Sequence, residues 1–473
     1  MLFTSYAFLC LFLPLTLLGF ASARRFGPRA PTVWMVFVSV LFYAAWNPAW
    51  LPILAVSVLG NFGLIHLCAR FPDRGWIVAV AIAANLGALV GFKLVSDVTP
   101  LGISFFTFTQ IACLLDCRED FLAGDRSPPG LLDYAILSMF FPHLIAGPVL
   151  RAREVLPTLS DTVFSSRNLA IGLFIFTIGL LKKTLVADPL GAVVNPAFAD
   201  PDGLSTLAAW HAALGWVMQL YFDFSGYSDM AIGLARMFNL RYPANFDSPY
   251  KARCIIDYWQ RWHMSLTRFL TASIYTPIAM AAMRARRTRG LPTNRRGQQT
   301  VAGFTMLLAV PIVATMALAG LWHGFTWNYL IFGLLHAGFL CVNHGWRLFR
   351  PVPTTARLAP AALTFLCIVA AAVIFRAPSL AVAGTILGAM GGLSDVPITM
   401  TSRAIADIGW LGLACALAWG APNTARIVAQ VEPGSATAFG WRPSLPWAVA
   451  FGSAATLGLL SAGSTREFLY FQF

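Results

Sequence analysis

The sequence is divided into long apolar runs, each about as long as a membrane is thick. A helix needs about 20 apolar residues to cross the hydrocarbon core of a bilayer. Of the 473 residues, 58% are hydrophobic and only 11% are charged, whereas soluble domains carry about 25% charged residues. The chain is therefore predicted to be an all-α, polytopic integral membrane protein. A disordered chain, a coiled coil and a secreted disulfide scaffold are excluded.

The few charged residues are mainly basic, with 33 Lys and Arg against 20 Asp and Glu and a net charge of +13. The arginines lie in short loops between apolar runs, which indicates a lipid bilayer as partner and no nucleic acid. The eight cysteines form no CxxC pair and have no histidine at zinc-ligand spacing. We therefore expect neither a metal site nor a disulfide framework.

The apolar runs predict about 11 or 12 transmembrane helices plus re-entrant segments around a central tunnel. The runs are residues 1–20, 32–46, 51–68, 77–92, 101–115, 131–145, 169–181, 207–221, 302–321, 329–342, 359–375, 405–419 and 447–460. The first run lacks a positively charged start, so we expect a retained span rather than a signal peptide. Residues 101–115 are amphipathic and interrupted by polar residues, which predicts a re-entrant or tunnel-lining element.

A cluster of six arginines within thirteen residues gives the strongest orientation signal: Arg284, Arg286, Arg287, Arg289, Arg295 and Arg296. This loop is expected in the cytoplasm. An alternative is that arginines near Arg287 hold the phosphates of a nucleotide-bearing donor. If residues 381–389 enter the membrane without crossing, Arg426 and Arg442 lie inside and the tail 464–473 outside. No repeat or linker is visible, so we expect one membrane domain, 1–473.

Ionisable residues inside apolar surroundings indicate function, because a charge costs several kcal/mol in a bilayer. One such region surrounds His263. On a helix, Trp259, Trp262, His263 and Leu266 would share one face, and Asp257 and Arg261 would form an i,i+4 pair. This arrangement would aim an imidazole into an aromatic interior.

The second region surrounds His323, which follows an apolar run with Trp322 before it and Asn328 after it. A neutral imidazole acts as a general base near pH 7, and an aromatic wall favours its neutral form. His143 is intermediate, and we interpret the remaining histidines as structural: His66, His211, His336 and His344.

Six motifs then carry a family resemblance. They are Leu101-Gly-Ile-Ser-Phe-Phe-Thr-Phe, Ala146-Gly-Pro-Val-Leu-Arg151, Phe222-Asp-Phe-Ser-Gly-Tyr-Ser-Asp-Met-Ala-Ile-Gly233, Asn245-Phe-Asp-Ser-Pro-Tyr250, Trp259-Gln-Arg-Trp-His-Met-Ser-Leu266 and Leu321-Trp-His-Gly324. Over residues 100–340 the chain resembles membrane-bound O-acyltransferases (MBOAT) of the alginate O-acetylation branch, which includes the teichoic acid D-alanylation protein.

The resemblance implies that His323 is the catalytic histidine and His263 the second active-site histidine, on the other side of a membrane tunnel. Trp322, Asn328, Trp259, Trp262, Asp257 and Arg261 are expected to shape that tunnel. The chain departs from the family at 269–280, where an Asp and a Tyr-Ile-Pro-Leu-Gly-Gly stretch are missing. The departure touches neither histidine.

The tail, Glu467-Phe-Leu-Tyr-Phe-Gln-Phe473, resembles the C-terminal motif of the partner protein in D-alanylation systems. The match implies that Tyr470 is an acyl carrier, and a phenyl ester of a phenol with pKa about 10 is a good acyl donor. An interfacial aromatic anchor and a tag remnant are the alternatives.

The expected function is transfer of an acyl group, most simply acetyl, from a cytoplasmic thioester toward an extracytoplasmic polysaccharide. Acetyl-CoA or an acyl carrier protein would be the donor, no bound cofactor is expected, and a periplasmic acetyltransferase with polysaccharide machinery would complete the transfer. The predicted location is the bacterial inner membrane. D-alanyl transfer to a cell-envelope polymer is an alternative, and a secondary transporter or lipid-linked sugar flippase is one from another class.

Overall fold

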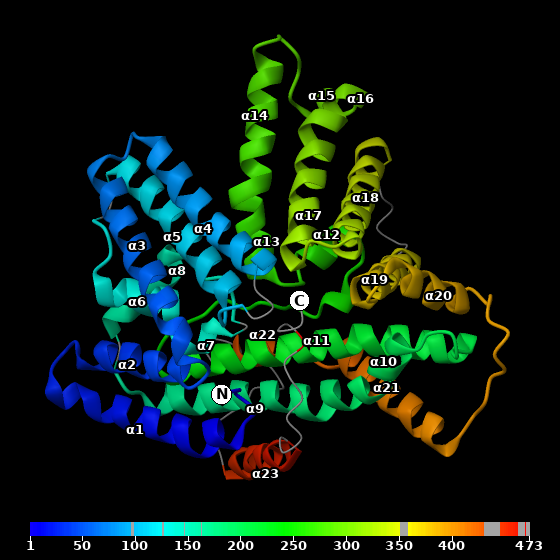
Figure 1. Cartoon of the computed structure of the whole chain (residues 1–473), viewed down its shortest axis with the longest axis horizontal. Helices are drawn as coiled ribbons and strands as arrows, with labels where there is room; N and C mark the ends of the chain where they lie inside the picture. The colour runs from blue at the N-terminus through cyan, green and yellow to red at the C-terminus, as the bar shows by residue number, and fades with distance from the viewer. Residues whose placement is uncertain are drawn as a thin grey trace. The chain divides into compact units, whose positions relative to one another are not determined.

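The computed structural model describes residues 1–95, 99–124, 127–145, 147–161, 163–350, 358–429, 445–461 and Leu469 (Figure 1). Every regular element in these ranges is a helix, which confirms the all-α prediction. Arg442, Tyr470 and the rest of the tail motif except Leu469 lie outside the described residues, so the predictions made for them stay predictions.

Six helices in the described ranges are long and apolar enough to cross a membrane: Ala7–Phe26, Pro48–Arg70, Gly75–Val95, Ser166–Ala199, Val301–His323 and Leu358–Arg376. Shorter apolar helices accompany them at Ala30–Ala44, Leu131–Leu144, Leu380–Met390 and Leu445–Ser461. The chain is therefore a multi-pass membrane protein. The count of about 11 or 12 crossings stays a prediction.

By internal packing the chain divides into two compact units. Unit 1 consists of Met1–Thr184, Phe224–Ala244 and Thr424–Glu467, and unit 2 of Leu185–Asp223, Asn245–Asn423 and Phe468–Phe473. Helix α11, Thr206–Met237, contributes its first part to unit 2 and its second part to unit 1. This division describes packing, and the expectation of a single membrane domain stays a prediction.

The helices that lie wholly in unit 1 are α1 (Leu13–Ala23), α2 (Ala30–Ala44), α3 (Leu51–Arg70), α4 (Gly75–Val95), α5 (Ile103–Ala123), α6 (Leu131–Met139), α7 (Phe141–Leu144), α8 (Ala152–Val155), α9 (Ser166–Leu181), α22 (Thr424–Ala429) and α23 (Leu445–Ser461). Those of unit 2 are α10 (Asp188–Ala199), α12 (Ile255–Trp259), α13 (Met264–Leu270), α14 (Thr276–Arg287), α15 (Arg295–Gln298), α16 (Val301–Phe304), α17 (Val310–His323), α18 (Trp327–Phe349), α19 (Leu358–Arg376), α20 (Leu380–Met390) and α21 (Ser402–Gly420).

Most of the amphipathic segment 101–115 lies in helix α5, which runs without a break for 21 residues, and the expectation of a re-entrant or tunnel-lining element there stays a prediction. Its Gln110 accepts hydrogen bonds from Ser57 at 2.8 Å and from Asn61 at 3.0 Å. The amides of Asn61 and Asn85 bond to each other at 3.0 and 2.7 Å. Neighbouring helices α3 and α4 thus take part in a buried amide network with α5, and polar side chains that are paired in this way need no break in the helix.

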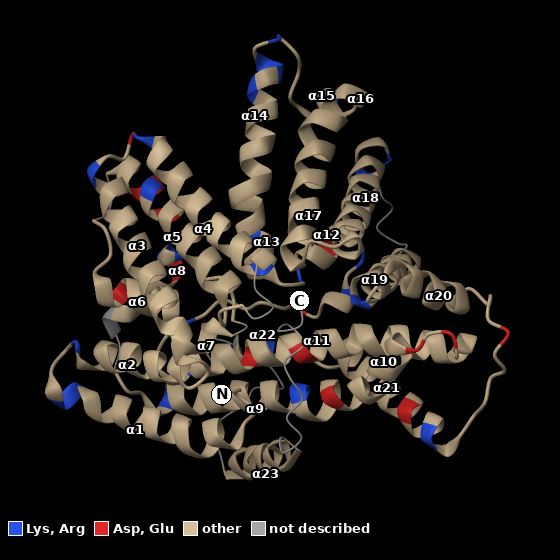
Figure 2. Ribbon diagram, viewed as in Figure 1, with Lys and Arg blue, Asp and Glu red and all other residues tan. Residues whose placement is uncertain are grey.

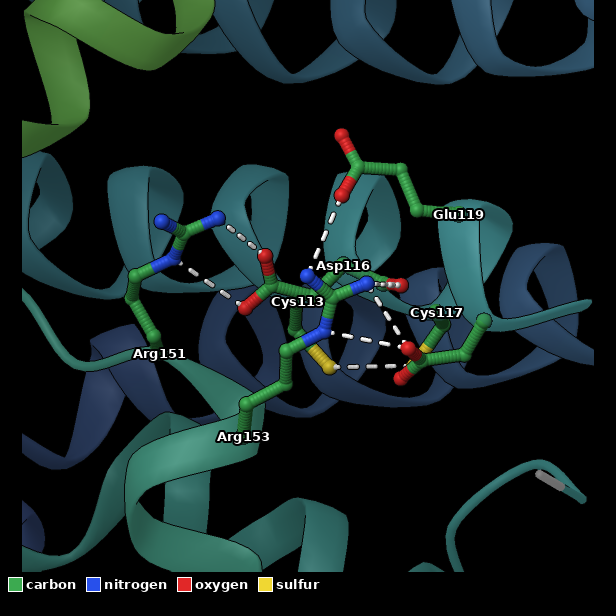
Figure 3. Close-up of polar contacts among 7 residues, drawn as sticks. Cys113, Asp116, Cys117, Glu119, Arg151 and Arg153 are labelled. Atoms are coloured by element: carbon green, nitrogen blue, oxygen red, sulfur yellow. Dashed lines mark hydrogen bonds and ion pairs between the residues drawn. The ribbon is translucent and has the colours of Figure 1, made fainter. Parts of the chain in front are cut away.

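An ion-pair network connects α5 to the chain that follows α7 (Figure 3). The carboxylate of Asp116 is fully buried and accepts two hydrogen bonds from the guanidinium of Arg151, one of them at 3.3 Å. Arg153 on α8 pairs with Asp120 at 2.7 Å and with Glu119 at 3.1 Å. A buried carboxylate is costly unless it is paired, so Arg151 holds this part of the chain against α5.

Helices α9 and α11 approach each other closely in unit 1 because each has two glycines, seven residues apart, at the contact. A Cβ on Gly172 would lie 2.6 Å from the carbonyl oxygen of Gly233, and a Cβ on Gly179 would lie 2.5 Å from that of Gly226. Small residues at such contacts let the backbones of membrane helices pack directly on each other.

We expect Gly179→Ala to destabilise the protein, because the added methyl group must force α9 away from α11. Overpacking of this kind costs about 1–3 kcal/mol in the free energy of unfolding. The measurement is thermal unfolding in detergent, with Gly87→Ala on α4 as the control, since no heavy atom lies within 4 Å of a Cβ there. Equal unfolding temperatures for the two variants would contradict the close contact.

Candidate functional site

The end of α17 positions His323. Helices α17 and α18 form an antiparallel hairpin in which a Cβ on Gly320 would lie 2.3 Å from the carbonyl oxygen of Tyr329, and a Cβ on Gly333 would lie 2.3 Å from that of Met316. The two backbones are therefore in direct contact. His323 is the last residue of α17 and lies beside the first turns of α18.

Aromatic rings surround His323, as the sequence predicts. The imidazole is half-buried, and its centroid lies 4.5 Å from the ring of Trp322 and 4.8 Å from that of Phe375 on α19. Tyr329 and Phe332 on α18 follow at 6.0 and 6.5 Å. Three helices of unit 2 thus contribute rings around one partly accessible imidazole.

Asn328 is buried at the start of α18 and ties this helix to the end of α19. Its Nδ2 donates to the carbonyl oxygens of Ile374 at 3.1 Å and Ala377 at 2.8 Å. These two bonds fix α19 where Phe375 meets His323. The side chain of Asn328 thus holds the backbone of α19 and thereby positions Phe375 beside the imidazole of His323.

The prediction of a continuous helix around His263 is wrong. Helix α12 ends at Trp259, and His263 has a left-handed backbone, with φ of 41°, as the residue before α13. Trp259, Trp262 and Leu266 therefore do not share one helix face with His263. The left-handed conformation is costly for a residue with a side chain, so tertiary contacts must hold it.

Contacts of Arg261 stabilise part of the turn that contains His263. Its Nε donates to Asp257 at 2.6 Å, which confirms the predicted i,i+4 pair. Its Nη1 also reaches the carboxylate of Asp247 at 3.3 Å and the Asp247 carbonyl at 3.2 Å, and the amide of Asp247 donates back to the Arg261 carbonyl at 3.0 Å. Arg261 therefore links the segment that contains Asp247 to α12, and this link stabilises the turn before His263.

Asn245 fixes the orientation of His263. The side-chain oxygen of Asn245 accepts from the backbone N–H of Ser265 at 3.3 Å and from its hydroxyl at 2.8 Å. The same oxygen lies 3.0 Å from Nδ1 of His263. The backbone N–H of Ser265 can only donate, so the Asn245 atom that it contacts is the side-chain oxygen. Because this oxygen can only accept, Nδ1 of His263 must carry the proton. The basic lone pair of His263 is then on Nε2.

His263 is buried, with 2% of its surface exposed, and lies outside the apolar spans. Burial lowers the pKa of His263 to about 3, because an imidazolium ion loses its hydration there. The imidazole is therefore neutral near pH 7.

The two predicted histidines belong to the same unit and are connected by a continuous series of aromatic contacts. In order, with ring centroids 4.6–6.5 Å apart, the series is His263, Phe246, Trp262, Tyr258, His336, Phe332 and His323. His336, which the sequence analysis interpreted as structural, lies in the middle of this series. Trp259 also contacts His336, at 5.2 Å.

Two residues of the site were not singled out by the sequence analysis. Asn245 stands in a quoted motif, but its role depends on a contact with His263 that sequence alone does not show. His336 belongs to a set of polar residues seven apart on α18, together with Tyr329 and Asn343, and this spacing is a signal that a search for helical periodicity finds.

Two further parts of the chain that the sequence singles out are residues 269–280 and the C-terminal tail. Residues 269–280, which depart from the family pattern, form the end of α13, the π-helical turn Thr271–Tyr275 and the start of α14. Leu469, beside the undescribed Tyr470, donates its backbone N–H to the carboxylate of Asp223 at 3.2 Å.

Comparison with known proteins shows which family and which relatives the chain resembles. Residues 76–290 match MBOAT, the membrane-bound O-acyltransferase family. The chain is 34% identical to the peptidoglycan O-acetyltransferase of Helicobacter pylori, over 85% of this chain and 82% of that protein. It is 32% identical to the probable alginate O-acetylase AlgI of Pseudomonas putida over the whole of both chains. Identity to the teichoic acid D-alanyltransferase of Bacillus subtilis is 28%, over 51% of this chain and 58% of that protein.

His263 should make stability depend on pH. Between about pH 6.5 and pH 3, the unfolded chain binds a proton at this histidine and the folded chain does not, so stability falls as the pH drops through this window. His263→Gln keeps an amide donor and does not titrate. We expect its unfolding temperature in detergent to fall less steeply than that of the wild type below about pH 6. His66→Gln, at an exposed position on α3, is the control, and equal slopes for His263→Gln and wild type would refute the buried neutral imidazole.

Proposed function

The chain belongs to the membrane-bound O-acyltransferase family, and from that premise we propose that it moves an acetyl group from a cytoplasmic thioester across the bacterial inner membrane for O-acetylation of an extracytoplasmic polysaccharide. The chain is an acyltransferase by family membership. Support for acetyl comes from relatives named as O-acetylating enzymes, which align over most of the chain, whereas the D-alanyltransferase of Bacillus subtilis aligns over about half of it.

The observation that carries the proposal is the pair of histidines on one aromatic series. Acyl transfer from a thioester needs a hydroxyl that loses its proton as it attacks the carbonyl carbon. The new C–O bond forms, the C–S bond breaks, and the thiolate leaves and takes up a proton. A neutral imidazole can accept the hydroxyl proton in the first step and return it to the leaving thiolate. Aromatic surroundings exclude water and so suppress hydrolysis of the thioester.

The two imidazoles differ in what they can contribute. His323 is half-buried at a helix end, and we assign it the base that meets the reacting groups. His263 is buried, neutral and held by Asn245, and its Nε2 carries the lone pair. We assign it the second active-site position, nearer the outer side. Trp322, Trp259, Trp262 and Asn328 would shape the tunnel between the two, while Asp257 and Arg261 hold the turn before His263.

Tyr470 would act as the covalent relay of the acetyl group. Its phenol would take the acetyl group from the thioester as a phenyl ester, and the thiol would be released. Transfer from a phenyl ester to a sugar hydroxyl is favourable because a phenol is the more acidic alcohol, with a pKa of about 10. A separate periplasmic acetyltransferase would complete the transfer to the polysaccharide.

The test of His323 uses purified protein and radiolabelled acetyl-CoA. His323→Ala should reduce consumption of the thioester by about 100-fold or more, because removal of a general base costs at least that factor. The control is His66→Ala, a histidine replacement at an exposed position, which should retain wild-type rates. Unchanged turnover in the His323 variant would refute its assignment as the base. If the wild type leaves acetyl-CoA intact, a carrier-protein donor is tested next.

Tyr470 is tested by intact-protein mass spectrometry after incubation with acetyl-CoA. The wild type should gain an acetyl adduct of about 42 Da. The adduct should be absent from Tyr470→Phe because the phenyl group cannot be acylated, and absent from His323→Ala because the transfer has no base. An adduct that persists in Tyr470→Phe would place the carrier elsewhere, and turnover without any adduct would favour direct passage to the acceptor.

A further inference from the structure

Helices α1 and α2 of unit 1 form a groove beside the turn 24–29 that connects them. The groove has a volume of about 770 Å³, which falls within the range of about 300–1,000 Å³ that is usual for small-molecule sites. It is lined by α1 from Gly19 to Ala23, by the turn, and by α2 from Ala30 to Phe37. Apart from Ser22 and Arg29, the lining is apolar.

An indole ring packed on a glycine forms one wall of the groove. The ring of Trp34 occupies the place that a Cβ on Gly19 would take, so it lies directly on the backbone of α1. Its Nε1 donates to the carbonyl oxygen of Thr16 at 2.9 Å. The ring of Phe37 follows, with its centroid 5.6 Å from that of Trp34. This hydrogen bond holds the indole between the two helices, so the wall has a defined position.

Large apolar side chains around the groove are exposed. Phe26, Val33 and Phe37 have between 49% and 84% of their surface accessible. Apolar groups of this size would be unfavourable in water, but the helix Ala7–Phe26 is long and apolar enough to cross a membrane. The exposed side chains around its end are therefore suited to contact with lipid.

The turn lies at the depth where lipid phosphates are expected. The span Ala7–Phe26 has 20 residues, which corresponds to about 30 Å and so to the thickness of the hydrocarbon core. Its end at Phe26 thus places the turn at the boundary with the headgroups. From there the groove extends about 10 Å along α1 and α2, or about two thirds of one leaflet. It has the length for the upper part of one acyl chain.

The turn is basic, and no acidic residue lies near it in the sequence (Figure 2). Arg24, Arg25 and Arg29 are all exposed, and the first 72 residues contain no Asp or Glu. Among the described residues, none of these three arginines forms an ion pair. Arg29 lines the groove, and Arg24 donates to the carbonyl oxygen of Pro28 at 3.1 Å, which places its guanidinium beside the groove. Guanidinium groups are well suited to bind phosphate.

A second basic turn in unit 1 shows what distinguishes this one. Basic loops also arise from membrane orientation alone. After α3, Arg70 and Arg74 lie over the ring of Phe71, at 5.6 and 4.6 Å from its centroid, and Asp73 is next to Arg74 in the sequence. These two arginines have an aromatic partner and an acidic neighbour. The arginines of the turn 24–29 lie instead beside an apolar groove.

We propose that the groove between α1 and α2 binds an anionic phospholipid of the surrounding membrane. One acyl chain lies in the groove against Trp34, and Arg24 and Arg29 bind the phosphate. A lipid with net negative charge is favoured because the turn carries three positive charges and no carboxylate. The bound lipid contacts both helices and so stabilises their pairing. This site is independent of the acyl transfer proposed above.

The phosphate contacts are tested by native mass spectrometry of the purified protein in detergent, titrated with phosphatidylglycerol or with phosphatidylcholine, which has no net charge. The wild type should bind phosphatidylglycerol more tightly. Arg24→Gln with Arg29→Gln should weaken this binding about 30-fold, the effect of two arginines beside an anionic lipid, and leave binding of phosphatidylcholine nearly unchanged. Arg24→Lys with Arg29→Lys keeps the charge and should retain the preference. The control, Arg70→Gln with Arg74→Gln, should bind both lipids as the wild type does.

The apolar part of the site is tested by filling the groove. Ser22 is exposed and lines the groove, so Ser22→Leu places a larger side chain where the acyl chain would lie. This variant should weaken binding of both lipids, because it blocks the chain and not the headgroup. Ala21→Leu is the matched control, since Ala21 is the preceding exposed residue of α1 and is not part of the lining.

Each outcome supports or overturns the proposal. Equal affinity of the wild type for the two lipids, or an equal loss in the control at Arg70 and Arg74, would show general surface charge and overturn it. Normal binding by Ser22→Leu would show that the groove holds no acyl chain. Tighter binding of a polyprenyl phosphate than of phosphatidylglycerol would identify a different occupant and also overturn it. Thermal unfolding without added lipid is measured for every variant, so that a loss of binding at an unchanged unfolding temperature is assigned to the site and not to the fold.

Discussion

The structure depends on the cost of leaving a polar atom unpaired in apolar surroundings. In a chain with 58% hydrophobic residues, a buried amide or carboxylate has few possible partners, and lacking one costs free energy. Gln110 is hydrogen-bonded to Asn61, Asp116 to Arg151, and His263 to Asn245. Each of these pairs joins segments that are distant in sequence. Hydrophobic burial brings the helices into the membrane, and the polar pairs determine which of them meet and in which register.

The different roles of hydrophobic burial and of polar pairs explain which features the sequence predicts well. Apolar length is a local property, so the run 51–68 corresponds to α3 and the run 359–375 to α19. The pair of Asp257 and Arg261 is four residues apart and was predicted for the same reason. The aromatic setting of His323 follows partly from Trp322 next to it. Where a feature depends on neighbours along the chain, pattern alone is sufficient.

Features that depend on distant partners were missed or wrong. The turn at His263 is held by Asn245 and by Arg261 bound to Asp247, and local helical periodicity contains no information about either contact. The pairing of the polar residues of α5 with residues of α3 also cannot be read from the pattern along α5 alone. The packing of His336 against Trp259 of α12 likewise cannot be read from the sequence of α18 alone.

The difference in burial between the two histidines of the candidate site, His263 and His323, has a chemical consequence. A buried imidazole with one fixed tautomer can accept a proton only from a group that reaches it inside the protein, because solvent cannot relax around the resulting charge. A half-buried imidazole at a helix end can exchange protons and meet a mobile substrate. Within unit 2, these differences match the roles proposed for His263 as a fixed acceptor and for His323 as the residue that meets the substrate. Under the proposed function, the aromatic rings between them would exclude water, which is the condition under which a thioester survives until its acceptor arrives.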